Sequence, residues 1–348
     1  MKARFLVFTD LHVDIMHDAV ARMEIICEAA AREHVDFLLH LGDVMYPDTD
    51  FLRQHAPESL EARKRAWFLN DRDDEKREIL RLLAATGLKL YGVLGNHDMD
   101  ACDKRAACLY WGMPGPYYAF VEGGVRFLAL DSNFIRTEEG LIDFEHCNYS
   151  GYKRRQTSFL PERQLRWLRE QALASAEPCV LLTHTPLGDD LLNVNNMQEV
   201  WAILRQVNAD RRRVVLAMNG HNHVDGLSVR EGVPFLSFNS ASNIWLGADY
   251  ATTRYSETLS RVYSHLPPCA PYYDPLYAVV QIDDDGIHVQ GTESRFVGPT
   301  PQQLGFPVDR SYFYPSARIS SHELPLSALA GDGAVFNANH EPDAGEKS

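Results

Sequence analysis

The sequence has no excess of basic residues, and it has no long apolar runs. Its 348 residues include 34 Lys and Arg against 48 Asp and Glu, which gives a net charge of −14 at pH 7. Proteins that bind nucleic-acid polymers need clustered Lys and Arg for contacts with phosphates, so we expect no polymer of this kind as a partner. No apolar run approaches the roughly 20 residues that span a bilayer, so we expect no membrane association.

Paired cysteines are also missing. The six cysteines show neither a Cys-x-x-Cys motif nor an even spacing. This pattern is typical of reduced thiols rather than of a disulfide framework. No basic stretch followed by an apolar segment and a cleavage site stands before the first strand-like run, so we expect no signal peptide. These features predict a soluble, cytoplasmic protein, and they leave its oligomeric state open.

Apolar runs and helical patterns alternate over the first hundred residues. We expect strands over 4–9, 37–41 and 88–94. Between the first two strands, apolar residues recur at helical spacing on one side, at Val20, Met23, Cys27 and Ala30. Between the second and third strands lies a charged helical region over about 60–85. This βαβαβ order favours a largely parallel sheet with helices packed on it.

The rest of the sequence indicates further strands, several of them in hairpins. Gly-containing turns interrupt the β-rich segments 117–131, 224–239 and 277–292, which predicts three hairpins. Two more strands are expected over 179–183 and 213–219, and a helix over 161–174. We expect a single domain over 1–318, because no linker divides the middle of the chain. The composition of 319–348, rich in Ser, Ala, Gly, Asp and Asn, predicts a partly disordered tail.

The expected strands end in polar side chains that can bind metal ions. The blocks are Thr9-Asp10-Leu11-His12, Gly42-Asp43, Gly95-Asn96-His97-Asp98, His184 and Gly220-His221-Asn222-His223. The carboxyl ends of parallel strands share one edge of a sheet, where α/β proteins place their sites. An isolated Asp-x-His after a strand is more often a turn or cap than a ligand pair. Five blocks in order, each after an apolar strand, favour a common metal site instead.

This series of blocks resembles the calcineurin-like metallophosphoesterase superfamily. The superfamily pattern is Asp-x-His, Gly-Asp, Gly-Asn-His-Asp or Glu, a lone His, and Gly-His-x-His, and the resemblance covers about residues 5–225. It implies a four-layer αββα sandwich, with two mixed β-sheets flanked by helices and the metal site at the carboxyl ends of the strands. It also implies a binuclear metallophosphoesterase, either a phosphodiesterase or a phosphatase.

The resemblance further implies which residues hold two metal ions. One ion would be bound by Asp10, His12, Asp43 and His223. The other would be bound by Asp43, Asn96, His184 and His221, so that Asp43 bridges the pair. Mixed imidazole and carboxylate ligation suits Mn, Fe, Zn or Co better than Ca or Mg, which prefer all-oxygen ligands. A water bridging two such ions loses a proton near neutral pH and can attack a phosphoester as hydroxide.

We therefore predict metal-dependent hydrolysis of a small-molecule phosphodiester or phosphomonoester. A similarity to class III phosphodiesterases slightly favours a diester or a nucleotide-like compound. We expect His97 to face the substrate, where it stabilises the transition state or protonates the leaving oxygen. We expect Asp98 to orient the imidazole of His97 and to raise its pKa.

Several alternatives stay open at this point. The Gly-Asp-x-x-Tyr block at 42–46 also resembles purple acid phosphatases, in which the Tyr binds ferric iron, so Tyr46 competes with His12 as a ligand. The region 48–80 is either a solvated helix or partly a lid over the metals. The basic run 153–155 either binds a remote substrate charge or forms an exposed turn. A non-catalytic scaffold for protein binding is the alternative function, although such scaffolds generally lack some ligands.

Overall fold

The computed structural model describes residues 1–63, 72–188, 192–307 and 314–326. Its first large sheet has six strands in the order β16-β15-β14-β1-β2-β3. The strands are β1 (Lys2–Phe8), β2 (Phe37–His40), β3 (Lys89–Gly92), β14 (Ala278–Asp283), β15 (Gly286–Gly291) and β16 (His322–Pro325). Strands β1, β2 and β3 pair in parallel, whereas β14, β15 and β16 extend the sheet in antiparallel pairs.

The second large sheet also has six strands, in the order β10-β11-β9-β8-β5-β4. They are β4 (Tyr118–Glu122), β5 (Val125–Ala129), β8 (Cys179–Leu182), β9 (Val214–Asn219), β10 (Gly226–Arg230) and β11 (Val233–Ser237). The central strands pair in parallel, and the hairpins β4–β5 and β10–β11 close the two edges. The two sheets are both mixed, as the sequence predicts.

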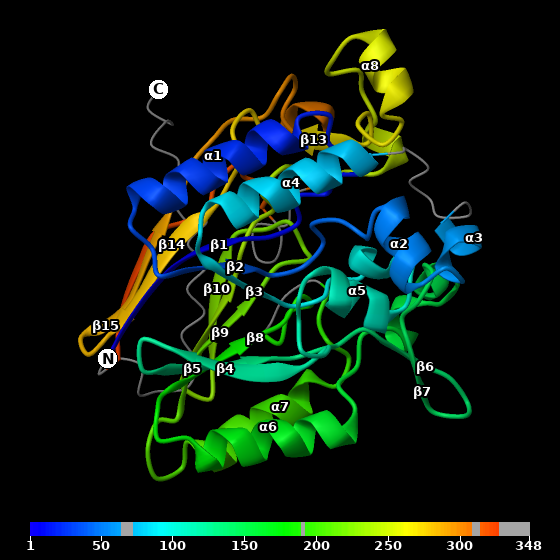
Figure 1. The fold of residues 1–348 in the computed structure, drawn as a ribbon. Coiled ribbons are helices and arrows are strands. Elements are labelled where there is room, and N and C mark those ends of the chain that lie inside the picture. The colour runs from blue at the N-terminus through cyan, green and yellow to red at the C-terminus, as the bar shows by residue number, and fades with distance from the viewer. Residues whose placement is uncertain (64–71, 189–191, 308–313, 327–348) are drawn as a thin grey trace, which may run out of the picture.

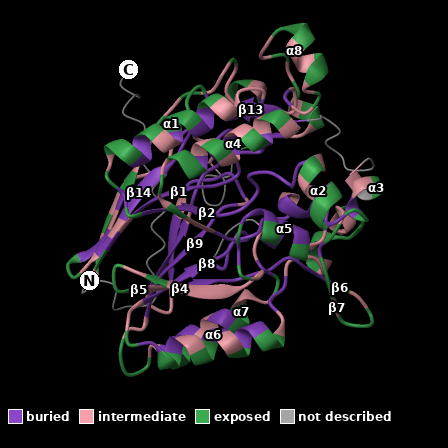
Figure 2. Ribbon diagram, in the orientation of Figure 1, coloured by how far each residue is buried: buried purple, intermediate pink, exposed green. Residues whose placement is uncertain are grey.

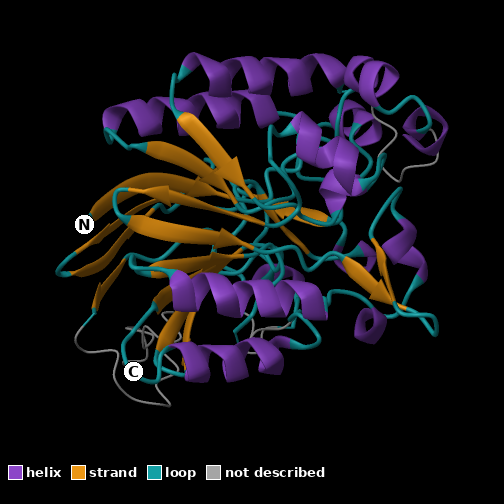
Figure 3. Cartoon of the chain, turned by 60° about the horizontal axis from the view of Figure 1, so that its bottom comes forward, coloured by secondary structure: helices purple, strands orange, loops and turns teal. Residues whose placement is uncertain are grey.

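Helices cover the outer face of each sheet, so the molecule has four layers (Figures 1 and 3). Helices α1 (Ala19–Arg32) and α4 (Asp73–Ala85) lie on the first sheet, and α6 (Glu162–Ala174) and α7 (Met197–Val207) lie on the second. The predicted αββα sandwich is therefore confirmed. In the described part of the chain, two small two-stranded sheets and four short α-helices accompany these layers: β6 (Phe134–Arg136) with β7 (Leu141–Asp143), β12 (Asn243–Trp245) with β13 (Cys269–Pro271), α2 (Thr49–His55), α3 (Ser59–Arg63), α5 (Lys104–Tyr110) and α8 (Glu257–Val262).

Strand β1 shows why the layers form. Its side chains alternate, so that Phe5 and Val7 enter the core between the sheets while Leu6 and Phe8 face the helical layer. Both faces are thus apolar and buried, which is typical of strands covered on two sides. Each such side chain contributes about 1.5–3 kcal/mol by leaving water. Figure 2 shows the same arrangement, with buried strands and helices whose exposed faces point outward.

The elements expected from the sequence are found with small shifts at their ends. All three predicted hairpins are present, and the helix predicted over 161–174 spans Glu162–Ala174 after Pro161. The six cysteines are free thiols. No helix in the described part of the chain is both long and apolar enough to cross a membrane.

The expected domain boundary at 318 is wrong. Ile319 is 3% exposed, and the strand β16 that follows pairs with β15 at the edge of the first sheet. Its sequence, His-Glu-Leu-Pro, carries little β propensity, and Pro325 is tolerated because an edge strand leaves some backbone groups unpaired. Residues 327–348, on which the rest of the predicted tail falls, lie outside the described residues.

Candidate metal centre

All seven predicted ligands follow strands of the two sheets. Asp10 and His12 follow β1, Asp43 follows β2 and Asn96 follows β3, while His184 follows β8 and both His221 and His223 follow β9. The sandwich brings these strand ends together. Two groups of potential ligands result, one formed by Asp10, His12 and His223 and the other by Asp43, His184 and His221. Within each group the ligand atoms lie within 4.8 Å of one another.

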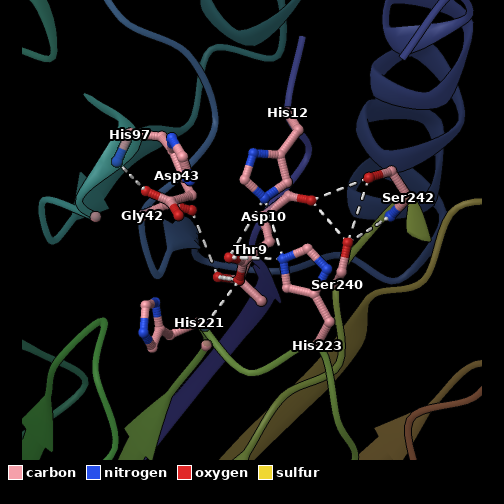
Figure 4. A network of polar contacts seen from close by, with 12 residues as sticks. Thr9, Asp10, His12, Gly42, Asp43, His97, His221, His223, Ser240 and Ser242 are labelled. Carbon is pink, nitrogen blue, oxygen red and sulfur yellow. Dashed lines mark hydrogen bonds and ion pairs between the residues drawn. The ribbon is translucent and has the colours of Figure 1, made fainter. Parts of the chain in front are cut away.

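The first group converges on one carboxylate oxygen. Asp10 Oδ1 lies 3.2 Å from His223 Nε2 and 3.7 Å from His12 Nε2 (Figure 4). The two Nε2 atoms are themselves only 3.0 Å apart. Two imidazole nitrogens and a carboxylate oxygen directed at one point form a suitable ligand set for a transition-metal ion.

The second group has the same character. His184 Nε2 lies 3.1 Å from Asp43 Oδ2 and 3.1 Å from His221 Nδ1. It also lies 3.9 Å from Asp10 Oδ1, so the two groups are adjacent. Adjacency of this kind is what a binuclear centre requires.

Hydrogen bonds on the far side of His184, His223 and Asp10 leave the atoms that face the cluster available. The Nδ1 atoms of His184 and His223 contact the carbonyl oxygens of Leu41 and Asn243, each at 2.7 Å, which selects Nε2 as the ligand atom. Asp10 Oδ2 accepts hydrogen bonds from the Thr9 hydroxyl at 2.5 Å and from the His221 amide at 3.0 Å. The other oxygen, Asp10 Oδ1, is buried without a hydrogen-bond donor in the described part of the chain.

Asn96 shows the same division of roles. Its Nδ2 donates to the Tyr149 hydroxyl at 3.2 Å, whereas its buried Oδ1 has no hydrogen-bond partner among the described residues. Buried acceptors are rarely left unpaired, because desolvation without a partner costs about 1–3 kcal/mol. An unpaired Asp10 Oδ1 beside converging imidazoles fits cation binding, and the unpaired Oδ1 of Asn96 is a further oxygen available to a cation. The residues present therefore match a pair of metal ions.

The backbone is strained at these ligands. Asp10, His12, Asp43, His221 and His223 all adopt positive φ, between 51° and 72°. This conformation costs non-glycine residues on the order of 1 kcal/mol or more and persists only where surrounding contacts enforce it. Here the loops support one another, because the amides of Asp10 and His12 donate to the carbonyls of Gly42 and Asp43, at 3.0 and 3.1 Å.

Two glycines permit the close approach of these loops. A Cβ atom on Gly95 would lie 2.1 Å from Asp43 Oδ1. A Cβ atom on Gly220 would lie 2.1 Å from Thr9 Oγ1 and 2.5 Å from Asp10 Oδ2. Gly95 and Gly220 are therefore required by the limited space around the carboxylates of Asp43 and Asp10.

The electrostatics of the cluster favour the metal-binding forms of Asp10, His12 and His221. Burial raises the pKa of Asp10, but the fields of His184 and His223 outweigh it and lower the pKa to about 2. Burial and neighbouring histidines lower the pKa values of His12 and His221 to about 3, so both rings are neutral at pH 7. Carboxylates in the anionic form and imidazoles in the neutral form are the states that bind metals. Burial lowers the pKa of His184, but the fields of Asp43 and Asp10 outweigh this effect and raise it to about 9, so His184 would release a proton on binding a metal.

His97 lies beside the ligands rather than among them. It begins the short 3₁₀ helix η1 (His97–Met99), and its side chain is 32% exposed. Its Nδ1 contacts Asp100 Oδ2 at 2.8 Å. Burial lowers the pKa of His97, but the fields of Asp100 and Asp43 outweigh this effect and raise it to about 10. The ring can therefore carry a proton at the edge of the metal site.

The prediction that Asp98 orients His97 is wrong. Asp98 Oδ2 accepts hydrogen bonds from the amides of Gly95, at 2.7 Å, and Asp43, at 3.2 Å, and so joins two ligand loops. Asp100 takes the predicted role because side chains three residues apart share one face of a 3₁₀ turn, whereas adjacent ones do not. Burial and the field of Asp43 raise the pKa of Asp98 to about 8.

Tyr149 is a site residue that the sequence analysis missed. Its hydroxyl contacts Asn96, Asp100 and His97 from the 3₁₀ helix η2 (Asn148–Gly151). No local motif marks it, since it lies about fifty residues from its partners along the chain.

The remaining candidates are Tyr46, the region 48–80 and the basic run 153–155. Tyr46 is buried, and Lys76 Nζ lies 3.4 Å from its ring centroid. Within 48–80, α4 packs beside α1 as part of a structural layer, and residues 64–71 lie outside the described residues (Figure 1). The basic run 153–155 is exposed.

A model of the calcineurin-like phosphoesterase family matches residues 3–225, which include all five blocks. The chain belongs to this family. Calcineurin-like phosphoesterase membership supports phosphoester hydrolysis as the reaction class and agrees with two His/Asp groups that could bind metals. No functionally curated protein matches the chain.

A solved structure shows the same fold as this calcineurin-like phosphoesterase. A dimetal phosphatase from Danio rerio has a TM-score of 0.55 and 15% sequence identity, covering 85% of this chain and 98% of its own. GAP50, the anchor in the inner membrane complex of Plasmodium, has a TM-score of 0.49 and 13% identity, covering 93% of this chain and 89% of its own. At such identities the likeness concerns the fold alone.

Proposed function

We propose that this chain hydrolyses a small-molecule phosphoester, either a diester or a monoester, at two transition-metal ions. The observation that carries the proposal is the convergence of two His/Asp groups beside a partly exposed His97 that is paired with Asp100. Six of the seven predicted ligands lie in the two groups, and the seventh, Asn96, follows strand β3. Because none of the predicted ligands is missing from the sequence, an enzyme is favoured over a non-catalytic scaffold.

The proposed ligands are divided between the ions as the sequence analysis predicts. Asp10, His12, Asp43 and His223 would hold one ion, and Asp43, Asn96, His184 and His221 the other. Imidazole-rich ligation suits Mn, Fe, Zn or Co. When bound, such ions would activate a water molecule and draw electron density from the phosphoryl oxygens.

The protein contributes the proton that the leaving group needs. His97 contacts Asp100 through Nδ1, so Nε2 is the ring atom that would meet a substrate. Asp100 is fully buried and stabilises the imidazolium form. Proton donation from Nε2 to the departing ester oxygen would produce an alcohol rather than an alkoxide.

The charge of the protein bears on the class of substrate. A net charge of −14 opposes binding of a polyanion through general surface electrostatics. We therefore propose a small phosphoester, recognised at the metal centre, rather than DNA or RNA, and we propose a cytoplasmic location without membrane partners. A nucleotide-like diester is one substrate of this class.

A metal and substrate screen tests the proposal. The chain is loaded with Mn, Fe, Zn or Co and assayed with bis-p-nitrophenyl phosphate and p-nitrophenyl phosphate. Asp43→Asn is expected to bind both ions more weakly and to lose at least about 100-fold in turnover, since it withdraws the bridging carboxylate. Asp249→Asn, at an exposed position, is the matched control and should behave as the wild type. A protein that holds two ions yet hydrolyses neither compound would instead be a scaffold.

A further inference from the structure

The Tyr149 hydroxyl connects a proposed metal ligand with the proposed proton donor. It donates to Asp100 Oδ1 at 2.6 Å and accepts from Asn96 Nδ2 at 3.2 Å. Asp100 in turn holds His97 Nδ1 through its other oxygen, Oδ2, at 2.8 Å. One hydroxyl therefore restrains both parts of the centre.

The direction of these hydrogen bonds decides which atom of Asn96 is available to a metal. A carboxylate only accepts, so the hydroxyl proton is directed at Asp100, and the hydroxyl oxygen is free to accept from an amide. The NH₂ group of Asn96 then faces Tyr149, and Oδ1 faces the opposite way, without a partner among the described residues. An amide NH₂ has no lone pair for a cation, so reversal of the amide would remove the ligand.

Backbone contacts of the segment before η2 fix the position of Tyr149 beside Asn96 and Asp100. His146 and Cys147, just before η2, adopt φ of 49° and 57°, which costs both residues energy. Their amides donate to the carbonyls of Cys102, at 3.0 Å, and Met99, at 3.3 Å, in the segment that also carries His97 and Asp100.

Side chains hold the same segment from two further directions. His146 Nε2 lies 3.2 Å from the hydroxyl of Ser59 in α3. The ring of Phe144 stacks on Tyr149, with centroids 4.8 Å apart. Strain that is enforced from several sides is characteristic of functional positioning.

We propose that Tyr149 is a positioning residue that selects Oδ1 of Asn96 as the metal ligand and fixes Asp100 behind His97. The inference rests on the two-metal site of the proposed function. It concerns metal affinity first, so it can be tested without a substrate. Partners that orient ligands in this way are typically worth about 10- to 100-fold in metal affinity.

The decisive variant is Tyr149→Phe, which removes the hydroxyl and keeps the ring on Phe144. Its affinity for Mn²⁺ is measured by calorimetric titration with MnCl₂ after chelation. One of the two binding events is expected to weaken by about 10- to 100-fold, and the other to change by less than about threefold. Tyr152→Phe is the matched control, because Tyr152 is an exposed tyrosine in the same segment, and it should bind both ions as the wild type does.

A double variant shows whether the effect passes through Asn96. If it does, Tyr149→Phe combined with Asn96→Ala should bind Mn²⁺ no more weakly than Asn96→Ala alone. Unchanged binding of both ions by Tyr149→Phe would overturn the proposal, as would additive losses in the double variant. Equal weakening of both ions with a lowered melting temperature of the metal-free protein would also overturn it, because it would indicate a purely structural role. Absence of hydrolysis in every variant would reject the proposed function while leaving this result intact.

Discussion

The buried ion pair between Lys76 and Asp14 offers a stringent test of how the metal loop is supported. Lys76 lies on α4 and is fully buried, and its Nζ is 3.0 Å from Asp14 Oδ1. Asp14 stands two residues after the proposed ligand His12, on the loop that leaves β1. The perturbation is Lys76→Met, which keeps an unbranched apolar stem and removes the charge.

The expected cost follows from what remains after the substitution. Asp14 is only 8% exposed, so Lys76→Met leaves a carboxylate in a site that water hardly reaches. Burial already raises the pKa of Asp14 against the opposing field of Lys76. Breaking one side of a buried pair typically costs about 3–5 kcal/mol, whereas replacing both partners by apolar residues is close to neutral. We therefore expect a loss of about 3–5 kcal/mol for Lys76→Met and recovery of most of it when Asp14→Leu is added.

The assay is urea-induced unfolding in the presence of a chelator, so that bound metal adds nothing to the free energy of unfolding. Arg81→Met is the matched control on the same helix. Arg81 is 62% exposed and pairs with Glu78 on the surface, and exposed pairs contribute at most about 1 kcal/mol. The reasoning is refuted if Lys76→Met costs no more than Arg81→Met, or if the double variant is as unstable as the single one.

Two further outcomes are expected. His97→Ala should lower turnover by about 10²- to 10⁴-fold. Its metal content, measured by elemental analysis, should stay at the wild-type level, because His97 belongs to neither ligand group. Loss of a metal ion from this variant would instead identify His97 as a ligand. The side chain of His288 on β15 is hydrogen-bonded to Glu323 on β16, and this contact raises the pKa of His288. The contact therefore stabilises β16 fully below about pH 6.5, the pKa of an unperturbed histidine. This stabilisation is lost as the pH rises through the higher pKa that His288 has in the folded protein. Amide exchange in β16, corrected for intrinsic base catalysis, should therefore accelerate above neutral pH, and His288→Gln should abolish that dependence.

The ligands and the layers of the fold were predictable for one shared reason. Each ligand block follows directly on an apolar strand, and short apolar runs such as that of β1 are visible in the sequence. Parallel pairing then requires the blocks to meet at one edge. The glycines of these blocks are recognisable as well, although only the structure shows that Gly95 and Gly220 are needed for close approach to carboxylates rather than for an unusual φ.

The errors arose where a local or distant contact decides the outcome. Strand β16 lacks an apolar alternation, and only the edge of a completed sheet explains why it forms. Asp100, and not Asp98 as predicted, is paired with His97 for a local reason, because a 3₁₀ turn after Asn96 places residues 97 and 100 on one face. A three-residue spacing between a histidine and an acid is therefore a signal that sequence reasoning could use. Tyr149 has no such signal, since its contacts with Asn96 and Asp100 depend on a strained turn held by bonds to another segment. Residues that bind a metal can be recognised by chemical type, whereas those that orient them are defined only by the completed fold.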